Sequence, residues 1–161
     1  PPPLGVFEAS RRVKRELGGL LRAPHPHIAV RPARRNPLQW QFVLHSLPPG
    51  SDFHGGCYHG RIVFSPRYPH EPPLAFMRTP SGRLPVDRGI HLSLTEEPPE
   101  RWSPAWSMEA LLHGFVVHFL SGADGGVGLV DSTPEFRRAL ADASWSFNAR
   151  CPEFRGTFPE L

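Results

Sequence analysis

Lysine is almost missing from this chain: Lys14 is the only lysine among 161 residues, and arginine carries nearly all of the positive charge. The formal net charge is only +3, and the arginines are scattered, with small groups at Arg11–Arg12 and Arg34–Arg35. A surface that binds nucleic acid needs such residues clustered on one face or interleaved with aromatic side chains. We therefore interpret the arginines as a solvated surface and expect no nucleic-acid partner.

Cysteine is scarce as well, since Cys57 and Cys151 are the only two. A single pair makes no disulfide framework and fits a reducing compartment, so we expect a cytoplasmic protein. No apolar run approaches the roughly 20 residues of a membrane-spanning helix. Contact with a membrane would therefore need an anchor outside these residues.

Histidine, in contrast, occurs nine times. His54, Cys57 and His59 lie close together in the sequence, but only Cys57 and His59 would share a face of a strand. A closed zinc site needs four ligands, which this group does not supply. We expect neither a metal site nor another cofactor.

Proline and glycine are abundant, at 21 and 15 residues, and fall between periodic segments rather than in a low-complexity tract. This favours one loop-rich domain over residues 8–150, with an N-terminal extension (1–7) and a C-terminal tail (151–161). Helical periodicity is found at 8–22, 108–120 and 134–147, and strand-like alternation at 27–31, 38–47, 57–64 and 74–77. Short connections between strands imply antiparallel neighbours. The predicted fold class is α/β (α+β): a four-stranded antiparallel meander flanked by helices.

The periodic segments also predict which side chains are buried. Ser107 and Thr133 are expected to cap the second and third helices, because their hydroxyl groups can accept from main-chain N–H groups. The predicted inner stripe of the first helix is Val13, Leu17, Leu20 and Leu21, and that of the third is Phe136, Leu140 and Trp145.

An ordered series of motifs follows this predicted framework. Residues 52–62 read Asp-Phe-His-Gly-Gly-Cys-Tyr-His-Gly-Arg-Ile, and residues 68–73 read Tyr-Pro-His-Glu-Pro-Pro. Residues 102–107 read Trp-Ser-Pro-Ala-Trp-Ser, and residues 131–141 read Asp-Ser-Thr-Pro-Glu-Phe-Arg-Arg-Ala-Leu-Ala. With these motifs the chain resembles the ubiquitin-conjugating enzymes over residues 8–147. It is most similar to their divergent, tail-anchored branch of the endoplasmic reticulum.

The resemblance implies the ubiquitin-conjugating (UBC) fold and the ubiquitin conjugation pathway. It also implies a location at the cytosolic face of the endoplasmic reticulum and a role in protein degradation there. In the family the nucleophile is the cysteine of Gly-x-x-Cys-Leu, and this chain reads Gly89-Ile90-His91-Leu92. A thiolate attacks well near neutral pH and also leaves well, whereas an acyl group on the His91 imidazole would be open to water.

A second departure lies at Thr79–Leu84, where the branch carries Thr-x-Asn-Gly-Arg-Phe. Ser81 stands at the place of the asparagine that steadies the developing oxyanion, and a shorter hydroxyl is a poor replacement for that amide. Two losses at one site predict a catalytically inactive member. Neither cysteine is a natural substitute, because Cys57 is expected to be a buried, inert thiol and Cys151 to lie unpositioned in the tail.

The resemblance implies docking of ligases through three segments: the first helix, the proline-rich loop after the third strand, and the loop before the second helix. Our first hypothesis is an adaptor that binds ubiquitin, an active conjugating enzyme or a ubiquitin ligase. The second is an active enzyme that transfers ubiquitin to lysine, either through another nucleophile or because His91 is not the native residue. The candidate partner-binding residues in these segments are Arg11, Arg12, Arg15, Pro66, Arg67, Pro98 and Ser103.

Overall fold

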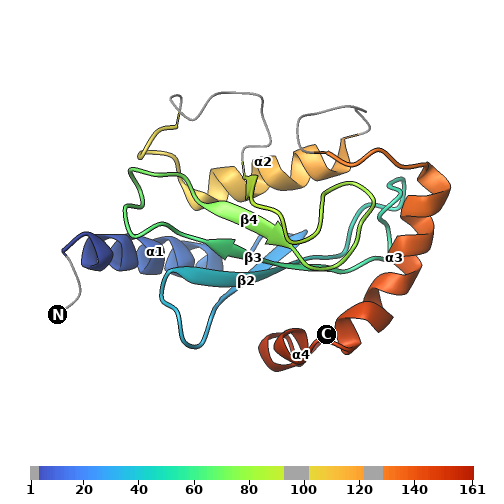
Figure 1. The fold of residues 1–161 in the computed structure, drawn as a ribbon, viewed down its shortest axis with the longest axis horizontal. Coiled ribbons are helices and arrows are strands. Elements are labelled where there is room, and N and C mark those ends of the chain that lie inside the picture. The colour runs from blue at the N-terminus through green and yellow to red at the C-terminus, as the bar shows by residue number, and fades with distance from the viewer. Residues whose placement is uncertain (1–3, 93–101, 122–128) are drawn as a thin grey trace.

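Five strands form one antiparallel sheet in which each strand pairs with the next one along the chain. The computed structural model describes residues 4–92, 102–121 and 129–161 (Figure 1). Four strands lie at the predicted places, so the meander and the α+β class are confirmed, and a fifth strand of two residues extends the sheet. The strands are β1 (Ile28–Pro32), β2 (Gln39–Leu44), β3 (Tyr58–Val63), β4 (Leu74–Met77) and β5 (Ile90–His91).

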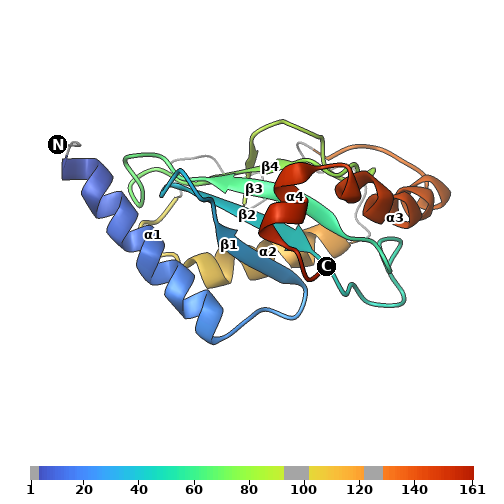
Figure 2. The same ribbon diagram turned by 90° about the horizontal axis from the view of Figure 1, so that it is seen from below.

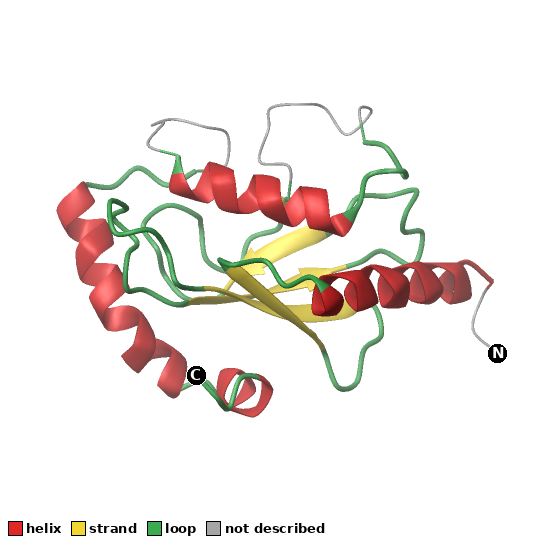
Figure 3. Cartoon of the chain, turned by 180° about the vertical axis from the view of Figure 1, so that it is seen from behind, coloured by secondary structure: helices red, strands yellow, loops and turns green. Residues whose placement is uncertain are grey.

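Helices cover both faces of this sheet. Helix α2 lies along one face, whereas the short helix α4 lies across β2 and β3 on the other (Figures 1 and 2). Helix α1 runs beside the sheet, with the N-terminus of the chain at its outer end, as the view from behind also shows (Figure 3). The helices are α1 (Leu4–Arg22), α2 (Met108–Leu120), α3 (Pro134–Ala149) and α4 (Pro152–Thr157).

Helix α2 provides the centre of the core, as its periodicity predicts. The Ser107 hydroxyl accepts a hydrogen bond from the Ala110 N–H and so caps its first turn. Phe115 meets Phe42 of β2 edge to face, with ring centroids 5.8 Å apart. Burial of each such aromatic side chain contributes about 1.5–3 kcal/mol, so α2 and the sheet stabilise each other.

Helix α1 begins at Leu4, four residues before the predicted start. The apolar stripe continues into this region through Val6, which packs against the core that contains Ala9, so the helical pattern extends towards the N-terminus. At the other end, Leu21 is 59% exposed, and the prediction that it belongs to the stripe is wrong. The stripe turns away from Leu21 and ends with Leu20, which is buried.

Helix α3 buries a face other than the predicted one. Phe136 and Trp145 are 53% and 41% exposed, so the predicted apolar inner stripe is wrong at these two residues, whereas Leu140 is half-buried. The Thr133 cap is confirmed, since its hydroxyl accepts from the Phe136 N–H. The buried residues of α3 recur at helical spacing and are mostly polar: Arg137, Ala141, Ser144 and Asn148.

Residues 151–161, predicted to be a tail, contain α4 and pack against the sheet. Phe154 and Phe158 are buried together with Cys151, Val43 and Cys57 in a second, smaller apolar cluster. The two phenyl rings lie with their centroids 5.9 Å apart. This cluster gives α4 the tertiary support that a six-residue helix needs, since so short a helix is marginal alone.

No helix among the described residues has both the length and the apolar character needed to cross a membrane.

Candidate functional site

His91 lies on β5, at the edge of the sheet. The register pairs His91 with Leu74 and Ile90 with Ala75 of β4. Because neighbouring side chains on a strand point to opposite faces, Ile90 is buried and His91 is exposed. The residue at the predicted nucleophile position is therefore an imidazole that solvent and a partner can reach.

Ser81 lies in a tight turn that leaves the end of β4. Its side chain is fully buried, and its hydroxyl oxygen accepts from the N–H groups of Arg83 and Leu84, each at 3.1 Å. No hydrogen bond joins Ser81 to His91 among the described residues. The structure therefore buries this hydroxyl within its own turn, out of contact with solvent.

The turn after Ser81 is fixed to two helices. Gly82 has φ +75°, and a Cβ atom there would lie 3.0 Å from the Ser132 hydroxyl. The buried Arg83 donates to the carbonyl oxygen of His118, at 3.1 Å, and to the hydroxyl of Ser121, at 2.9 Å. The guanidinium thereby satisfies carbonyl and hydroxyl groups at the C-terminal end of α2, where a positive charge is favourable.

Neither cysteine is placed for nucleophilic chemistry. Cys57 is fully buried, as predicted, and burial raises the pKa of its thiol to about 12 despite a hydrogen bond with Asn148. Cys151 is only 9% exposed, so the prediction of a loose thiol in a tail is wrong. Its sulfur lies 3.6 Å from a guanidinium nitrogen of Arg78. At neutral pH the Cys57 thiolate is thus strongly disfavoured, and Cys151 is shielded by its neighbours.

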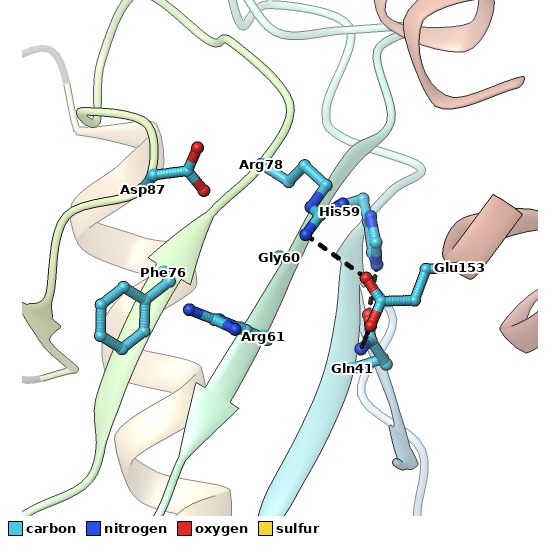
Figure 4. A pocket seen from close by; sticks show the side chains of 8 residues that line it. All are labelled: Gln41, His59, Gly60, Arg61, Phe76, Arg78, Asp87 and Glu153. Atoms are coloured by element: carbon cyan, nitrogen blue, oxygen red, sulfur yellow. Dashed lines mark hydrogen bonds and ion pairs between the residues drawn. The ribbon is translucent and has the colours of Figure 1, made fainter. Parts of the chain in front are cut away.

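The face of the sheet under α4 carries a polar network in which His59 and Gln41 are buried and Arg78 and Glu153 are partly exposed (Figure 4). The His59 imidazole donates through Nε2 to Oε1 of Gln41, at 2.5 Å, and the Gln41 amide donates to Glu153 of α4, at 2.9 Å. Glu153 also pairs with Arg78, at 3.4 Å. Burial, and secondly the charge of Arg78, lower the pKa of His59 to about 4, so this imidazole is neutral near pH 7.

In the described parts of the chain, no three His, Cys, Asp or Glu side chains lie together as metal ligands would. His54 and His59 are directed to different partners, the carbonyl oxygen of Leu47 and the amide of Gln41. His25 and His113 do meet, with ring nitrogens 3.2 Å apart, but as a hydrogen-bonded pair.

The three predicted docking segments come together at one end of the domain. Arg12 of α1 donates to the carbonyl oxygens of Pro104 and Trp106, at 3.0 and 3.3 Å. The indole N–H of Trp102 donates to the carbonyl oxygen of Pro69, at 2.7 Å, which joins the loop before α2 to the proline-rich loop. These contacts make a continuous surface from segments far apart in the sequence.

The individual docking candidates differ in how available they are. Arg12 is engaged inside the protein, since it also pairs with Glu16 at 2.9 Å. Ser103 is half-buried, and Pro98 lies outside the described residues. The exposed candidates are Arg11, Arg15, Pro66 and Arg67.

Comparison with known proteins establishes the family to which this chain belongs. The model of the ubiquitin-conjugating enzyme family matches residues 12–129, which include both Ser81 and His91. The chain belongs to the ubiquitin-conjugating enzyme family. A structure of human ubiquitin-conjugating enzyme E2 G1 matches the fold with a TM-score of 0.58 and 22% identity, over 69% of this chain and 93% of that one. This similarity confirms the UBC fold.

Curated relatives within the family are similar over most of this chain. It is 37% identical to ubiquitin-conjugating enzyme E2 34 of Arabidopsis thaliana over 150 residues, which are 93% of this chain and 62% of the relative. It is 40% identical to human ubiquitin-conjugating enzyme E2 J1 over 139 residues, 86% of this chain and 43% of the relative. The chain thus spans about three fifths or less of the length of these two relatives.

Sequence reasoning missed the polar residues that hold this family fold together around the site. Thr79, Arg83 and Asn148 are buried and hydrogen-bonded, and none of them was assigned a role. The available signal was the spacing of Arg137, Ser144 and Asn148, which places them on one face of α3. The apolar residues on the neighbouring faces of the helix gave a stronger signal for burial than this polar spacing, and they pointed to the wrong face.

Proposed function

We propose that this member of the ubiquitin-conjugating enzyme family does not carry ubiquitin as a thioester and acts as an adaptor. The observation that carries the proposal is an exposed imidazole at residue 91, together with two thiols that are buried elsewhere. Thioester chemistry needs an accessible thiolate held beside its reaction partners. An imidazole in that place is no stable acyl carrier, because an acylimidazole would lose its acyl group to water before transfer.

The adaptor would bind ubiquitin, an active conjugating enzyme or a ubiquitin ligase. Support comes from the joined docking segments, where the family fold is kept although the nucleophile is not. Exposed Arg11, Arg15 and Arg67 surround these segments and offer charged contacts at their rim.

We extend the proposal to the cytosolic face of the endoplasmic reticulum and to protein degradation there. The motifs at residues 52–62 and 131–141 support this extension, because they resemble the tail-anchored branch. Fractionation of cells that express the natural full-length protein tests it. Recovery in microsomes, with the tagged UBC domain open to protease from the cytosolic side, is expected, and recovery only in the supernatant would overturn the extension.

A charging assay tests the central proposal. The protein is incubated with ubiquitin-activating enzyme, ATP and labelled ubiquitin, and products are separated with and without reductant. We expect no reductant-sensitive adduct, while immobilised protein should retain ubiquitin, a conjugating enzyme or a ligase. An adduct removed by reductant would overturn the proposal, and its loss in Cys57→Ser or Cys151→Ser would identify a relocated nucleophile.

An active ubiquitin transferase is the second candidate, favoured by one observation. Residue 91 is exposed on β5, so a cysteine at this position would be open to the C-terminus of ubiquitin. The genomic codon for residue 91 separates the two candidates. A histidine codon supports the adaptor, and a cysteine codon supports the transferase.

A further inference from the structure

We infer that the groove between α4 and the turn from β1 to β2 binds an extended, carboxylate-rich peptide segment of a partner protein. This groove has a volume of about 360 Å³. The turn and α4 lie side by side below the sheet, on the side opposite α2 (Figures 1 and 3). It does not include residue 91, so the inference is independent of the proposed function. The residues that matter for binding are Arg34, Arg35, Asn36, Gln39, Gly156 and Thr157.

The groove carries an uncompensated positive charge. Arg34 and Arg35 are exposed at its rim, and neither forms an ion pair with any residue that the structure describes. The carboxylate that lines the groove belongs to Glu153, and it is already held by Arg78 and by the amide of Gln41. The two guanidinium groups are therefore left to a ligand, and guanidinium groups pair best with planar carboxylates.

Amide groups next to these arginines add hydrogen-bond donors. The side-chain oxygen of Asn36 accepts from the Leu38 N–H at 2.9 Å, which orients the amide and leaves its nitrogen as a donor. The turn itself is closed by a hydrogen bond from the Ala33 N–H to the carbonyl oxygen of Gln39, also at 2.9 Å. The donors are thus presented by a turn of fixed shape.

The opposite wall of the groove is held equally firmly. The start of α4 is tied to β2 through Glu153 and Gln41, and its end is tied to β1, because Arg31 donates to the carbonyl oxygen of Thr157 at 2.7 Å. The Arg31 guanidinium also lies over the Phe158 ring, 4.9 Å from its centroid. Because both walls are fixed before a ligand arrives, little ordering entropy is lost on binding.

Gly156 keeps the groove open from the side of α4. A Cβ atom built at Gly156 would meet no heavy atom within 4 Å. Glycine costs a helix interior about 1 kcal/mol relative to alanine, and here no packing contact explains its presence. An extended main chain could pass closely over this position.

The chemistry favours a peptide over a nucleic acid. Single strands need aromatic platforms on which bases stack, and the aromatic side chains of α4, Phe154 and Phe158, are buried. Two neighbouring guanidinium groups with amides suit a few carboxylates in a row, whereas tight binding of a phosphate backbone needs more cationic contacts.

Fluorescence anisotropy of a labelled oligoglutamate peptide tests the inference, with oligoglutamine and oligothymidylate as competing probes at the same ionic strength. Arg34→Glu with Arg35→Glu should weaken oligoglutamate binding by about tenfold or more, as expected for two charge-assisted contacts. The control Lys14→Glu with Arg88→Glu changes the net charge by the same amount at exposed residues away from the groove and should change affinity less than twofold. Equal losses in the two double variants, or tighter binding of oligothymidylate, would overturn the inference.

A second pair of variants tests the groove by shape, with no change of charge. Gly156→Trp should fill the groove and abolish oligoglutamate binding, while Gly156→Ala should keep it, since only the larger side chain blocks the path. Circular dichroism of both variants checks that α4 still forms. Undiminished binding by a folded Gly156→Trp variant would place the peptide elsewhere and overturn the inference.

Discussion

The side-chain amide of Asn148, near the end of α3, donates a hydrogen bond of 2.8 Å to the main-chain carbonyl of Cys57, just before β3. The oxygen of the same amide accepts from the hydroxyl of Thr79, at 2.5 Å, and that hydroxyl in turn accepts from the His59 N–H, at 2.9 Å. One buried amide thus joins α3, β3 and the end of β4. Helix α3 is held by these polar contacts, and its most apolar face is turned towards solvent.

Asn148→Ala should be among the most destabilising single substitutions in α3. It leaves the Cys57 carbonyl and the Thr79 hydroxyl without this partner, and each buried unsatisfied group costs about 1–3 kcal/mol. We expect the free energy of unfolding to fall by about 2–4 kcal/mol in denaturant titrations. Ser146→Ala, at an exposed position of the same helix, is the control and should change it by less than about 0.5 kcal/mol. Similar losses in both variants would contradict the role of Asn148.

His91→Cys should restore formation of a ubiquitin thioester. The side chain at residue 91 is exposed on β5, so the new thiol is open to the activating enzyme. Discharge onto free lysine should stay slow, because Ser81 is fully buried in its own turn and its short hydroxyl is a poor replacement for an asparagine amide as oxyanion donor. Charging and single-turnover discharge are followed on non-reducing gels.

Cys151→Ser in the His91→Cys background is the matched control for that experiment. The adduct should persist in this double variant, because Cys151 is buried beside Phe154 and does not face the sheet edge. A folded His91→Cys protein that fails to charge would show that the docking surface for the activating enzyme is lost as well.

Acidification should destabilise the fold through His59. Its pKa is lowered from 6.5 to about 4 by burial and by Arg78, whereas in the unfolded chain the imidazole titrates near its ordinary value. Well above pH 6.5 the group is neutral in both states and contributes no pH dependence. Between pH 6.5 and about 4 only the unfolded chain takes up the proton, so stability falls as pH falls, by roughly 2–3 kcal/mol in total.

Denaturant titrations of the wild type and of His59→Gln, across this pH range, measure the effect. Groups remote from residue 59 titrate alike in both proteins, so the difference between the two curves reports His59 and its immediate network. The variant should lose less stability than the wild type on going from pH 6.5 to about pH 4.5. Parallel curves would show that His59 is not a source of the acid sensitivity.

Two glycine substitutions should act in opposite directions. Gly82→Ala places a Cβ atom 3.0 Å from the Ser132 hydroxyl, at a residue with φ +75°, and should cost about 1–2 kcal/mol or more. Gly19→Ala lies within α1, where a Cβ meets no atom within 4 Å, and should stabilise by about 1 kcal/mol. Melting temperatures from calorimetry compare the two, and a rise for Gly82→Ala would contradict the crowding at the turn.

The parts of the fold that follow from periodicity could be predicted from the sequence. Alternating side chains placed the first four strands, and the apolar spacing with the Ser107 cap placed α2 at its observed bounds. β5 could not be predicted, because two residues are too few to show alternation. Helix α4 could not be predicted either, because it depends on packing against Val43 and Cys57, which no local pattern reveals.

At the site, the sequence motifs pointed to residue 91, but its surroundings required the structure. The exposure of His91 follows from its register with Leu74, and a register cannot be read from a two-residue strand. The burial of Ser81 could not be predicted either, since a serine in a turn is ordinarily solvated. Hydrophobicity likewise predicted the wrong buried face of α3. The face that is buried is polar, and it is stabilised by hydrogen bonds to segments distant in the sequence, which no local pattern reveals.

The strand order has a consequence for how the protein folds. Each strand pairs with its neighbour in sequence, so the sheet can form through short loops. In contrast, Asn148 of α3 contacts Cys57, 91 positions earlier in the chain, and Glu153 of α4 contacts Gln41, 112 positions earlier. Because closing long loops costs more chain entropy, the C-terminal helices should dock after the sheet has formed. Cys57 and Cys151 become covered only by that docking, so the rate at which the two thiols lose their reactivity towards an alkylating reagent during refolding measures this last step.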